Sequence, residues 1–245
     1  MAKVLVSGSA GAVGEQVCRE LAARGHRLRG LDRVPTQGLD DCIVADIGDL
    51  DAVRGAVAGV DVVVHLAAEA HDRDFPSRLV GPNVVGLYNV LHAARQEKVP
   101  RVILASSMQV APERPGHPAA RADESAPLNH YALSKLWAEQ MGEMYARCFG
   151  LRVLCARLCW MVRNVAEARE LEETNRTDAY ISRRDTARFF ALAVEADWGD
   201  FAVVFGGGVG SERLFDAEPA RRLLGYVAMD AWPDGLPFAY PPKRT

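Results

Sequence analysis

Tyr131 and Lys135 are the pair of side chains in this sequence best suited to moving a proton. They belong to one long amphipathic segment, and a four-residue spacing places both on one face of a helix. A phenol has a pKa of about 10, too high for a base at neutral pH, but a neighbouring ammonium group favours the phenolate. Ser107 ends a predicted strand and is placed to hydrogen-bond the same oxygen atom. We therefore expect Ser107, Tyr131 and Lys135 to form a catalytic group that exchanges a proton with an alcohol or a carbonyl.

A glycine-rich segment, GSAGAVG at residues 8–14, predicts a binding site for a dinucleotide. It lies between a predicted strand and a predicted helix, the context that a dinucleotide fingerprint requires. Glycine permits a tight turn and lets the backbone approach a pyrophosphate, which the N-terminus of the following helix attracts. The residues expected to bind the cofactor in this segment are Gly8, Gly11, Ala12, Val13 and Gly14.

Asp32 ends the second predicted strand, about twenty residues beyond the glycines, where a carboxylate accepts hydrogen bonds from the adenosine ribose and repels a 2′-phosphate. Arg33 follows and can stack on adenine or tolerate a phosphate, so the sequence favours NAD over NADP as cofactor. Asp46 and Ile47 follow the third predicted strand, and we expect them to flank the adenine ring. For Asp46, an ordinary turn or helix cap is the alternative.

The elements that position these residues follow an alternating pattern of short apolar runs and helical segments. Continuous apolar strands separated by helices predict a parallel sheet that is covered on both faces. Residues 112–127 predict a surface loop, and residues 160–179 are weakly patterned and predict irregular structure. The predicted strands are residues 3–7, 27–32, 41–46, 61–66, 101–107, 152–158 and 201–205, and the predicted helices are 13–24, 49–58, 83–98, 131–149, 184–196 and 218–224.

This pattern predicts an α/β fold, a Rossmann-type doubly wound parallel sheet with a reduced C-terminal substrate cap. We expect one domain over residues 1–245. Its NAD-binding core spans residues 1–160, and small cap elements span residues 160–182 and 206–245.

Composition excludes several classes of function. The 245 residues include 29 basic and 32 acidic side chains, a net charge of −3, which argues against a general nucleic-acid binder. No apolar run approaches the length of a membrane span, and the N-terminus leaves no room for a signal peptide. The five cysteines fit no zinc framework, and no metal site is expected. We expect free thiols and a cytoplasmic location.

Seven short motifs together resemble the extended short-chain dehydrogenase/reductase family, the NAD-dependent epimerase/dehydratase group. The motifs are GSAGAVG at 8–14, GLDR at 30–33, ADI at 45–47, HLAA at 65–68, NVVGLYNVLHAA at 83–94, ASS at 105–107 and YALSK at 131–135. The resemblance spans residues 3–160. It implies that Leu66, Ala67 and Ala68 line the cofactor, and that Asn83 anchors a helix near the nicotinamide. It also implies that Tyr131 and Lys135 contact the cofactor, and that the protein forms a homodimer or a higher homo-oligomer.

Residues 174–196 resemble the uronate dehydrogenases of this family, which oxidise the C1 hydroxyl of a free hexuronic acid to a lactone with NAD. This resemblance implies that Arg176 clamps a substrate carboxylate, and a solvated loop arginine is the alternative. The chain departs from that group at positions expected to face the substrate, which are Ala12, Ala70, Met108, Gln109 and Trp160. A pocket that lacks hydroxyl partners binds a polyol poorly. The substrate is therefore expected to be a small molecule, either a sugar acid or a less polar hydroxy or keto compound.

The expected function is an NAD-dependent oxidoreductase, in which hydride passes between nicotinamide C4 and a secondary carbinol or hemiacetal carbon. An epimerase or dehydratase acting on a sugar or sugar nucleotide is the first alternative, and a non-catalytic dinucleotide sensor is the second. Near the expected pocket, His65 is interpreted as a core histidine rather than a base, and residues 71–74 as a solvated loop rather than a substrate contact.

Overall fold

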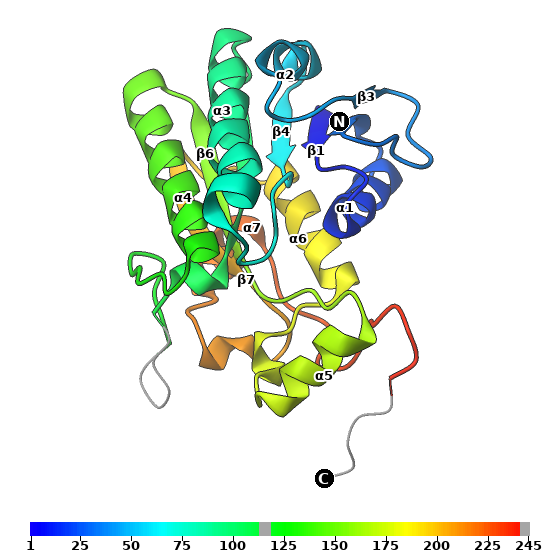
Figure 1. Cartoon of the computed structure of the whole chain (residues 1–245), viewed down its shortest axis with the longest axis vertical. Helices are drawn as coiled ribbons and strands as arrows, with labels where there is room; N and C mark the ends of the chain where they lie inside the picture. Colours follow the sequence, from blue (N-terminus) through cyan, green and yellow to red (C-terminus); the bar gives the residue numbers. More distant parts are fainter. Residues whose placement is uncertain (113–118, 241–245) are drawn as a thin grey trace.

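The computed structural model describes residues 1–112 and 119–240, and it forms a parallel sheet between two sets of helices (Figure 1). Across these residues the sheet has seven strands in the order β3-β2-β1-β4-β5-β6-β7. The strand order reverses between β1 and β4, where α/β sheets of this kind bind their ligands. The strands are β1 (Lys3–Ser7), β2 (Arg27–Asp32), β3 (Cys42–Val44), β4 (Val62–His65), β5 (Arg101–Ser107), β6 (Arg152–Leu158) and β7 (Phe201–Gly206).

The central strands are apolar on both faces because helices cover both. In β1, Leu5 contributes to one core cluster, and Val4 and Val6 contribute to the other. The parallel register pairs Ser7 of β1 with His65 of β4, so these two strands end at the same level. The predicted doubly wound parallel sheet is confirmed, with β3 shorter than the residues 41–46 predicted for it.

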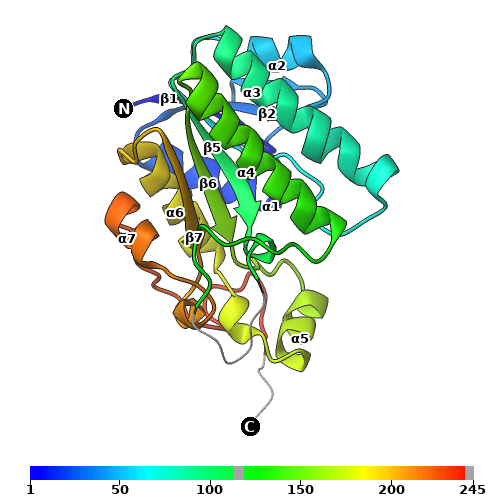
Figure 2. The same ribbon diagram turned by 90° about the vertical axis from the view of Figure 1, so that its left-hand side faces the viewer.

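Three helices cover each face (Figures 1 and 2). One face carries α2 (Leu50–Val57), α3 (Leu87–Gln96) and α4 (His130–Phe149), and the other carries α1 (Ala12–Ala23), α6 (Arg183–Glu195) and α7 (Glu218–Leu224). The longest of these, α4, begins after Asn129, whose side chain accepts a hydrogen bond from the Ala132 N–H at 2.7 Å. It ends at Gly150, which adopts a left-handed conformation with a φ of 69°. Glycine adopts this conformation easily because it has no side chain.

The helix predicted over residues 83–98 begins earlier than expected. A segment of wide π-helical turns, η1 (Phe75–Gly86), precedes α3 directly. Asp74 caps this segment by accepting a hydrogen bond from the Ser77 N–H at 3.0 Å. Pro82 lies inside it. A proline interrupts a regular helical ladder because its nitrogen has no hydrogen to donate, and here the interruption falls within the wider turns.

The prediction of irregular structure over residues 160–179 was wrong, because helix α5 (Val165–Glu173) lies there. The side chain of Asn164 caps this helix by accepting a hydrogen bond from the Glu167 N–H at 3.0 Å. Within α5 only Ala168 and Leu171 are buried, so the apolar stripe is too narrow to give a clear pattern. The helix lies beyond the carboxyl ends of the strands and packs with residues of the C-terminal segment (Figure 1).

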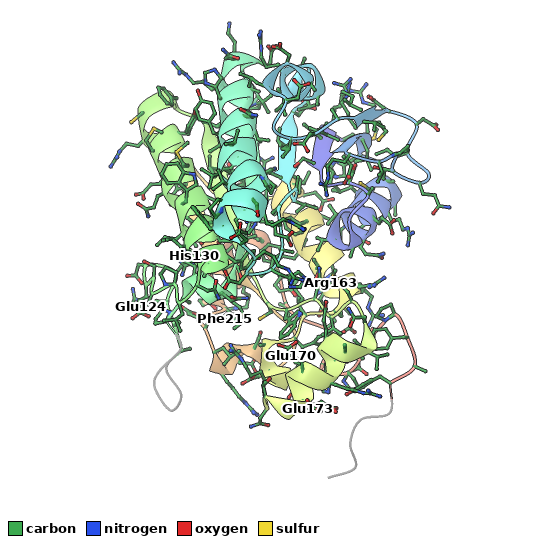
Figure 3. The ribbon with its side chains drawn as sticks, in the orientation of Figure 1. Glu124, His130, Arg163, Glu170, Glu173 and Phe215 are labelled. Atoms are coloured by element: carbon green, nitrogen blue, oxygen red, sulfur yellow. The ribbon has the colours of Figure 1, made fainter. Side chains whose placement is uncertain are left out.

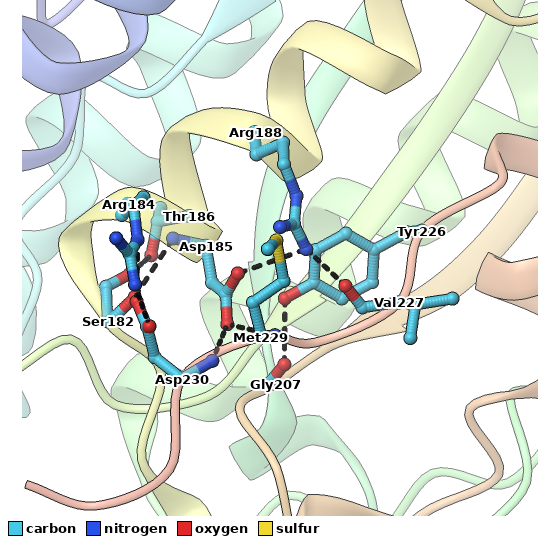
Figure 4. Close-up of polar contacts among 10 residues, drawn as sticks. All are labelled: Ser182, Arg184, Asp185, Thr186, Arg188, Gly207, Tyr226, Val227, Met229 and Asp230. Carbon is cyan, nitrogen blue, oxygen red and sulfur yellow. Dashed lines mark hydrogen bonds and ion pairs between the residues drawn. The ribbon is translucent and has the colours of Figure 1, made fainter. Parts of the chain in front are cut away.

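Asp185, at the start of α6, connects the C-terminal segment to this helix (Figure 4). Its carboxylate accepts hydrogen bonds from the N–H groups of Met229 and Asp230, both at 2.9 Å, and it pairs with Arg188 at 3.1 Å. Ser182 donates to the Asp230 carboxylate at 2.6 Å. A buried charge is tolerated where several donors satisfy it, and this carboxylate has both backbone donors and a cation.

A buried ion pair, Arg157 with Glu139, connects β6 to α4. Two parallel hydrogen bonds of 2.9 and 2.8 Å join the two side chains, which are 2% and 3% exposed. Ser106 donates to the same carboxylate at 2.5 Å, and Arg157 donates to the Glu124 carbonyl at 2.8 Å. Glu124 belongs to the segment predicted as a surface loop over residues 112–127, of which residues 113–118 lie outside the described part. Arg157 of this ion pair therefore connects the loop at Glu124 to β6.

Candidate active site

The glycine-rich turn connects β1 to α1 and lies against the end of β4. Gly8 has a φ of 73°, and a β-carbon placed on it would lie 2.7 Å from the Ala67 nitrogen. A β-carbon on Gly14 would lie 2.0 Å from the Gly8 carbonyl oxygen. Neither position accepts a side chain, so the backbone itself forms this surface. The N-terminus of α1 at Gly11 has no side-chain cap, which leaves its N–H groups for an anion.

Leu66, Ala67 and Ala68 follow β4 and are half-buried beside the turn. The Leu66 N–H donates to the Ser7 carbonyl at 3.0 Å, which continues the β1–β4 pairing into the site. Ala12 and Val13, at the start of α1, are half-buried and pack toward the cluster that contains Met161 and Ile181. These residues lie where a cofactor contact was predicted, and that role stays a prediction.

The carboxylates of Asp32 and Asp46 have different surroundings. The Asp32 carboxylate is half-buried and accepts a hydrogen bond from the Ala10 N–H at 3.0 Å, so it lies against the glycine-rich turn. Arg33 beside it is exposed. Asp46 is exposed and closes a turn by accepting from the Gly48 N–H at 2.7 Å, which is the alternative that the sequence left open. The carboxylate best placed for an adenosine ribose is therefore that of Asp32.

Ile47 is buried in the core, 7% exposed, where it packs against η1. Asn89 of α3 donates to the carbonyls of Ile47 and Gly48 at 3.0 and 2.9 Å and holds this turn in place. The sequence reasoning passed over Asn89, although a polar residue on the apolar face of a predicted helix was a signal. The adenine contact assigned to Ile47 stays a prediction.

The structure brings Ser107, Tyr131 and Lys135 together where β5 ends beneath the first turns of α4. All three side chains are buried, with 6%, 9% and 8% exposed. Burial raises the pKa of Tyr131, and a hydrogen bond with Ser107 and the positive charge of Arg163 act in the opposite direction. The Lys135 ammonium lies 5.7 Å from the centre of the Tyr131 ring and donates to the Ala105 carbonyl at 2.9 Å. Burial lowers the pKa of Lys135 to about 8.

Asn83 and Asp72 position the first turn of α4. The Asn83 side chain donates to Ser134 at 2.9 Å, and it exchanges two hydrogen bonds with the Glu69 backbone, at 2.8 and 3.1 Å. Asp72 accepts from the Tyr131 N–H at 3.2 Å. Asp72 was interpreted as part of a solvated loop, and its side chain is exposed as expected while it also caps the first turn of α4. The loop after β4 is thus joined to the helix that carries Tyr131.

His65 is a core residue, as predicted. It is buried, and its Nδ1 shares a hydrogen bond of 2.7 Å with Ser7. Burial together with the positive charge of Lys135 lowers the pKa of His65 to about 3. A neutral, hydrogen-bonded imidazole in this position supports the sheet beneath the site rather than exchanging a proton with a substrate.

The residues predicted to face a substrate lie in several places. Met108 and Trp160 are half-buried against one apolar cluster, which contains Val162, Leu171 and Tyr180. Gln109 is exposed and accepts from Asn129, the cap of α4, at 3.0 Å. Ala70 is exposed. Arg176 is half-buried, and its positive charge acts on the Cys159 thiol. Met108 and Trp160 therefore lie beside one apolar cluster, Gln109 lies at the cap of α4, and a substrate contact by these residues stays a prediction.

Arg163 lies near the predicted catalytic residues, and the sequence analysis assigned it no role. It lies just before α5 and between the Rossmann layers and the cap (Figure 3). Its guanidinium pairs with Glu167 at 2.9 Å and contacts the ring of His71. No spacing motif marks Arg163, because its place depends on how an irregular segment crosses the sheet. The pair Arg163–Glu167 at a spacing of four residues was the only sequence signal.

The residues at the glycine-rich turn and the end of β2 fit an NAD molecule. The turn leaves no room for side chains at Gly8 and Gly14, the start of α1 has no side-chain cap, and Asp32 lies at the end of β2. No group of three or more metal-ligating side chains occurs in residues 1–112 and 119–240. Within the same residues, no helix is long and apolar enough to cross a membrane.

Comparison with known proteins decides the family. Residues 4–195 match the model of the NAD dependent epimerase/dehydratase family. The chain belongs to this family. It is 29% identical over 249 residues to the L-arabinose 1-dehydrogenase (NAD(P)(+)) of Haloferax volcanii, a match that covers 94% of this chain and 97% of that protein. It is 33% identical over 162 residues to the uronate dehydrogenase of Agrobacterium fabrum, covering 64% of this chain and 61% of that protein.

Solved structures agree with this family. The glucuronic acid dehydrogenase of Chromohalobacter salexigens superposes with a TM-score of 0.81 at 26% identity, covering 94% of this chain and 86% of that one. The uronate dehydrogenase of Agrobacterium tumefaciens superposes with a TM-score of 0.79 at 26% identity, covering 93% of this chain and 84% of that one. The resemblance seen in the sequence motifs is therefore confirmed for the family and for the fold.

Proposed function

We propose that this family member is an NAD-dependent dehydrogenase that oxidises a ring hydroxyl of a sugar or a sugar acid. The observation that carries the proposal is the meeting of Ser107, Tyr131 and Lys135 at the end of β5, close to the strand reversal. The predicted oxidoreductase class and the NAD cofactor agree with relatives that are named as NAD-dependent or NAD(P)-dependent dehydrogenases.

The side chains divide the work on the substrate oxygen. Ser107 orients the hydroxyl, and Tyr131 accepts its proton in the ionised form as the carbon is oxidised. Burial raises the pKa of Tyr131 and opposes this form, whereas the Ser107 hydrogen bond and the positive charge of Arg163 favour it. When it is bound, NAD supplies the acceptor for the hydride that leaves this carbon. Lys135 keeps a positive charge near the phenol at any pH below its pKa of about 8, which favours the phenolate. In the reverse direction, Tyr131 donates the proton to the carbonyl oxygen.

A sugar substrate replaces the less polar hydroxy or keto compound as the preferred proposal. The apolar side chains of Met108 and Trp160 motivated the less polar alternative. Relatives matched over most of their length are named for arabinose and glucose 6-phosphate, and partial matches are named for uronate. Arg176 is proposed as the group that holds a substrate carboxylate when one is present.

Turnover with a panel of free sugars tests this proposal. We expect NADH to accumulate when the protein is mixed with NAD and L-arabinose, galactose, glucuronate or galacturonate, read by the near-ultraviolet absorbance of NADH. An epimerase would convert the sugar without accumulating NADH. A protein that binds NAD and changes none of these sugars would contradict the proposed reaction.

The outer faces of α3 and α4 support a homodimer. Tyr88 on α3 and Trp137 on α4 leave 43% and 44% of their surface exposed, and Leu133 is 50% exposed. Exposed apolar side chains gathered on adjacent helices mark an interaction surface. Light scattering of the purified protein would show twice the chain mass, and Trp137→Glu should shift it toward the mass of one chain.

The five free cysteines support a cytoplasmic location.

A further inference from the structure

Arg163 has an unusually complete set of partners for a residue in an irregular segment. Its Nε donates to Glu167 at 3.0 Å, its Nη2 lies 2.9 Å from the same carboxylate, and its backbone N–H donates to Glu167 at 2.9 Å. Glu167 in turn accepts from Trp160 and from Asn164, the latter at 3.2 Å. An arginine side chain loses much conformational freedom when it is ordered. Here the contacts with Glu167 already order the Arg163 side chain before any ligand binds.

The ordered guanidinium faces the catalytic residues rather than the outer surface of the cap. Its Nη2 contacts His71, and the next residue, Asp72, accepts from the Tyr131 N–H at 3.2 Å. The positive charge of Arg163 also acts on the Tyr131 phenol. Figure 3 shows Arg163 between the lower ends of the Rossmann helices and α5. The loop that contains His71 and Asp72 therefore connects Arg163 to Tyr131, the residue proposed to take the substrate proton.

One edge of the guanidinium is left for a ligand. Glu167 occupies Nε and shares Nη2 with His71. Nη1 forms no hydrogen bond with any residue that the structure describes. The side chain of Arg163 is 30% exposed, so part of it is accessible to a small molecule. Donors fixed in advance bind a ligand at a lower entropic cost than donors that must be ordered on binding.

We propose that Arg163 is a specificity-determining residue whose Nη1 donates to a hydroxyl of the sugar ring while Tyr131 and Ser107 hold the oxidised carbon's oxygen. This rests on the proposed dehydrogenase function. It would supply a polar contact that the apolar side chain of Met108 beside this segment cannot offer. Because Glu167 balances the charge of Arg163, the site is suited to a neutral hydroxyl, and Arg176 remains the group proposed for a carboxylate.

Calorimetry on a catalytically blocked background tests the assignment. Tyr131→Phe would be saturated with NAD and titrated with L-arabinose and with glucuronate, alone and combined with Arg163→Gln or Arg163→Lys. Losing a hydrogen bond from a charged donor weakens binding by about 10- to 100-fold, and both sugars should weaken to a similar extent. Arg163→Lys should recover little, since an ammonium cannot use the forked contacts with Glu167. Arg169→Gln is the matched control, since Arg169 is exposed on α5, the helix that Arg163 precedes.

Four results would overturn the assignment. The first is unchanged affinity in Arg163→Gln, and the second is an affinity that falls equally in Arg169→Gln. The third is a loss confined to glucuronate, which would make Arg163 a carboxylate ligand instead. If neither sugar binds to the Tyr131→Phe protein, the assignment fails as well. Turnover by the wild-type protein reports separately on the proposed function, because sugars that bind without being oxidised would contradict only that function.

Discussion

The Rossmann core and the cap hold their functional side chains by different means. In the core, Gly8 and Gly14 shape the turn through backbone contacts alone, and Lys135 is fixed by a backbone carbonyl at 2.9 Å. In the cap, Arg163 is held by other side chains, chiefly Glu167 and His71. A site built on backbone geometry tolerates change around it, whereas a site built on side-chain pairs changes with each partner. If the proposed function holds, catalysis would be set by the core and substrate choice by the cap.

Removing the phenol oxygen should have the largest effect, and it should be confined to chemistry. Tyr131→Phe is expected to lower kcat by about 100- to 10,000-fold, because the general base is lost. NAD should still bind, since the glycine-rich turn is untouched. Steady-state kinetics and fluorescence titration with NADH would measure the two quantities. Tyr145→Phe, a buried tyrosine farther along the same helix, is the matched control and should retain kcat. Comparable losses in both variants would contradict the assigned base.

The buried ion pair tests how far the core depends on charge. Glu139→Gln should lower the free energy of unfolding by about 3–5 kcal/mol, because Arg157 is left buried without its partner. Urea unfolding would measure this loss. The double variant Glu139→Gln with Arg157→Met should recover much of it, since both charges are then absent. A double variant less stable than Glu139→Gln would show that the pair itself stabilises the fold.

The cap should respond to the loss of a single carboxylate charge without a change in the core. Asp185→Asn is expected to cost about 1.5–3 kcal/mol of unfolding free energy, because charged hydrogen bonds to the C-terminal segment are weakened. NAD affinity should stay unchanged. Asp51→Asn is the control, because that side chain is 95% exposed. A fall in NAD affinity as large as the fall in stability would show that the two regions are not separable.

A smaller effect follows from the buried ammonium of the core. Lys135 has a pKa of about 8 in the folded protein against 10.5 in the ordinary state, so the unfolded chain binds its proton more tightly. Between these values, stability contributed by this group rises with pH, by at most about 1.4 kcal/mol per pH unit. Unfolding free energies of the wild type and Lys135→Met would be compared from pH 7 to pH 10. The unfolding free energy of the wild type should rise with pH relative to that of Lys135→Met. A constant difference would contradict a lowered pKa.

The sequence predicted the core better than the cap, for physical reasons that individual residues show. Buried parallel strands give continuous apolar runs, so β1 and β5 matched their predicted ranges. Helix α5 was missed because only two of its residues are buried, although Asn164 followed by Glu167 has the spacing of a helix cap. Arg163 was missed because the path of an irregular segment depends on tertiary packing. The helical segment was predicted to begin at residue 83 although it begins at Phe75, because Pro82 interrupts its pattern.

Transfer of a deuterium label tests the central claim most directly. L-arabinose or glucuronate carrying deuterium at C1 would be mixed with NAD and the wild-type protein, and the NADH formed would be weighed by mass spectrometry. If Tyr131 and Ser107 hold the C1 oxygen during direct oxidation, the NADH carries one deuterium and the rate falls relative to unlabelled sugar. Unlabelled NADH, or sugar that changes configuration while no NADH accumulates, would contradict the account.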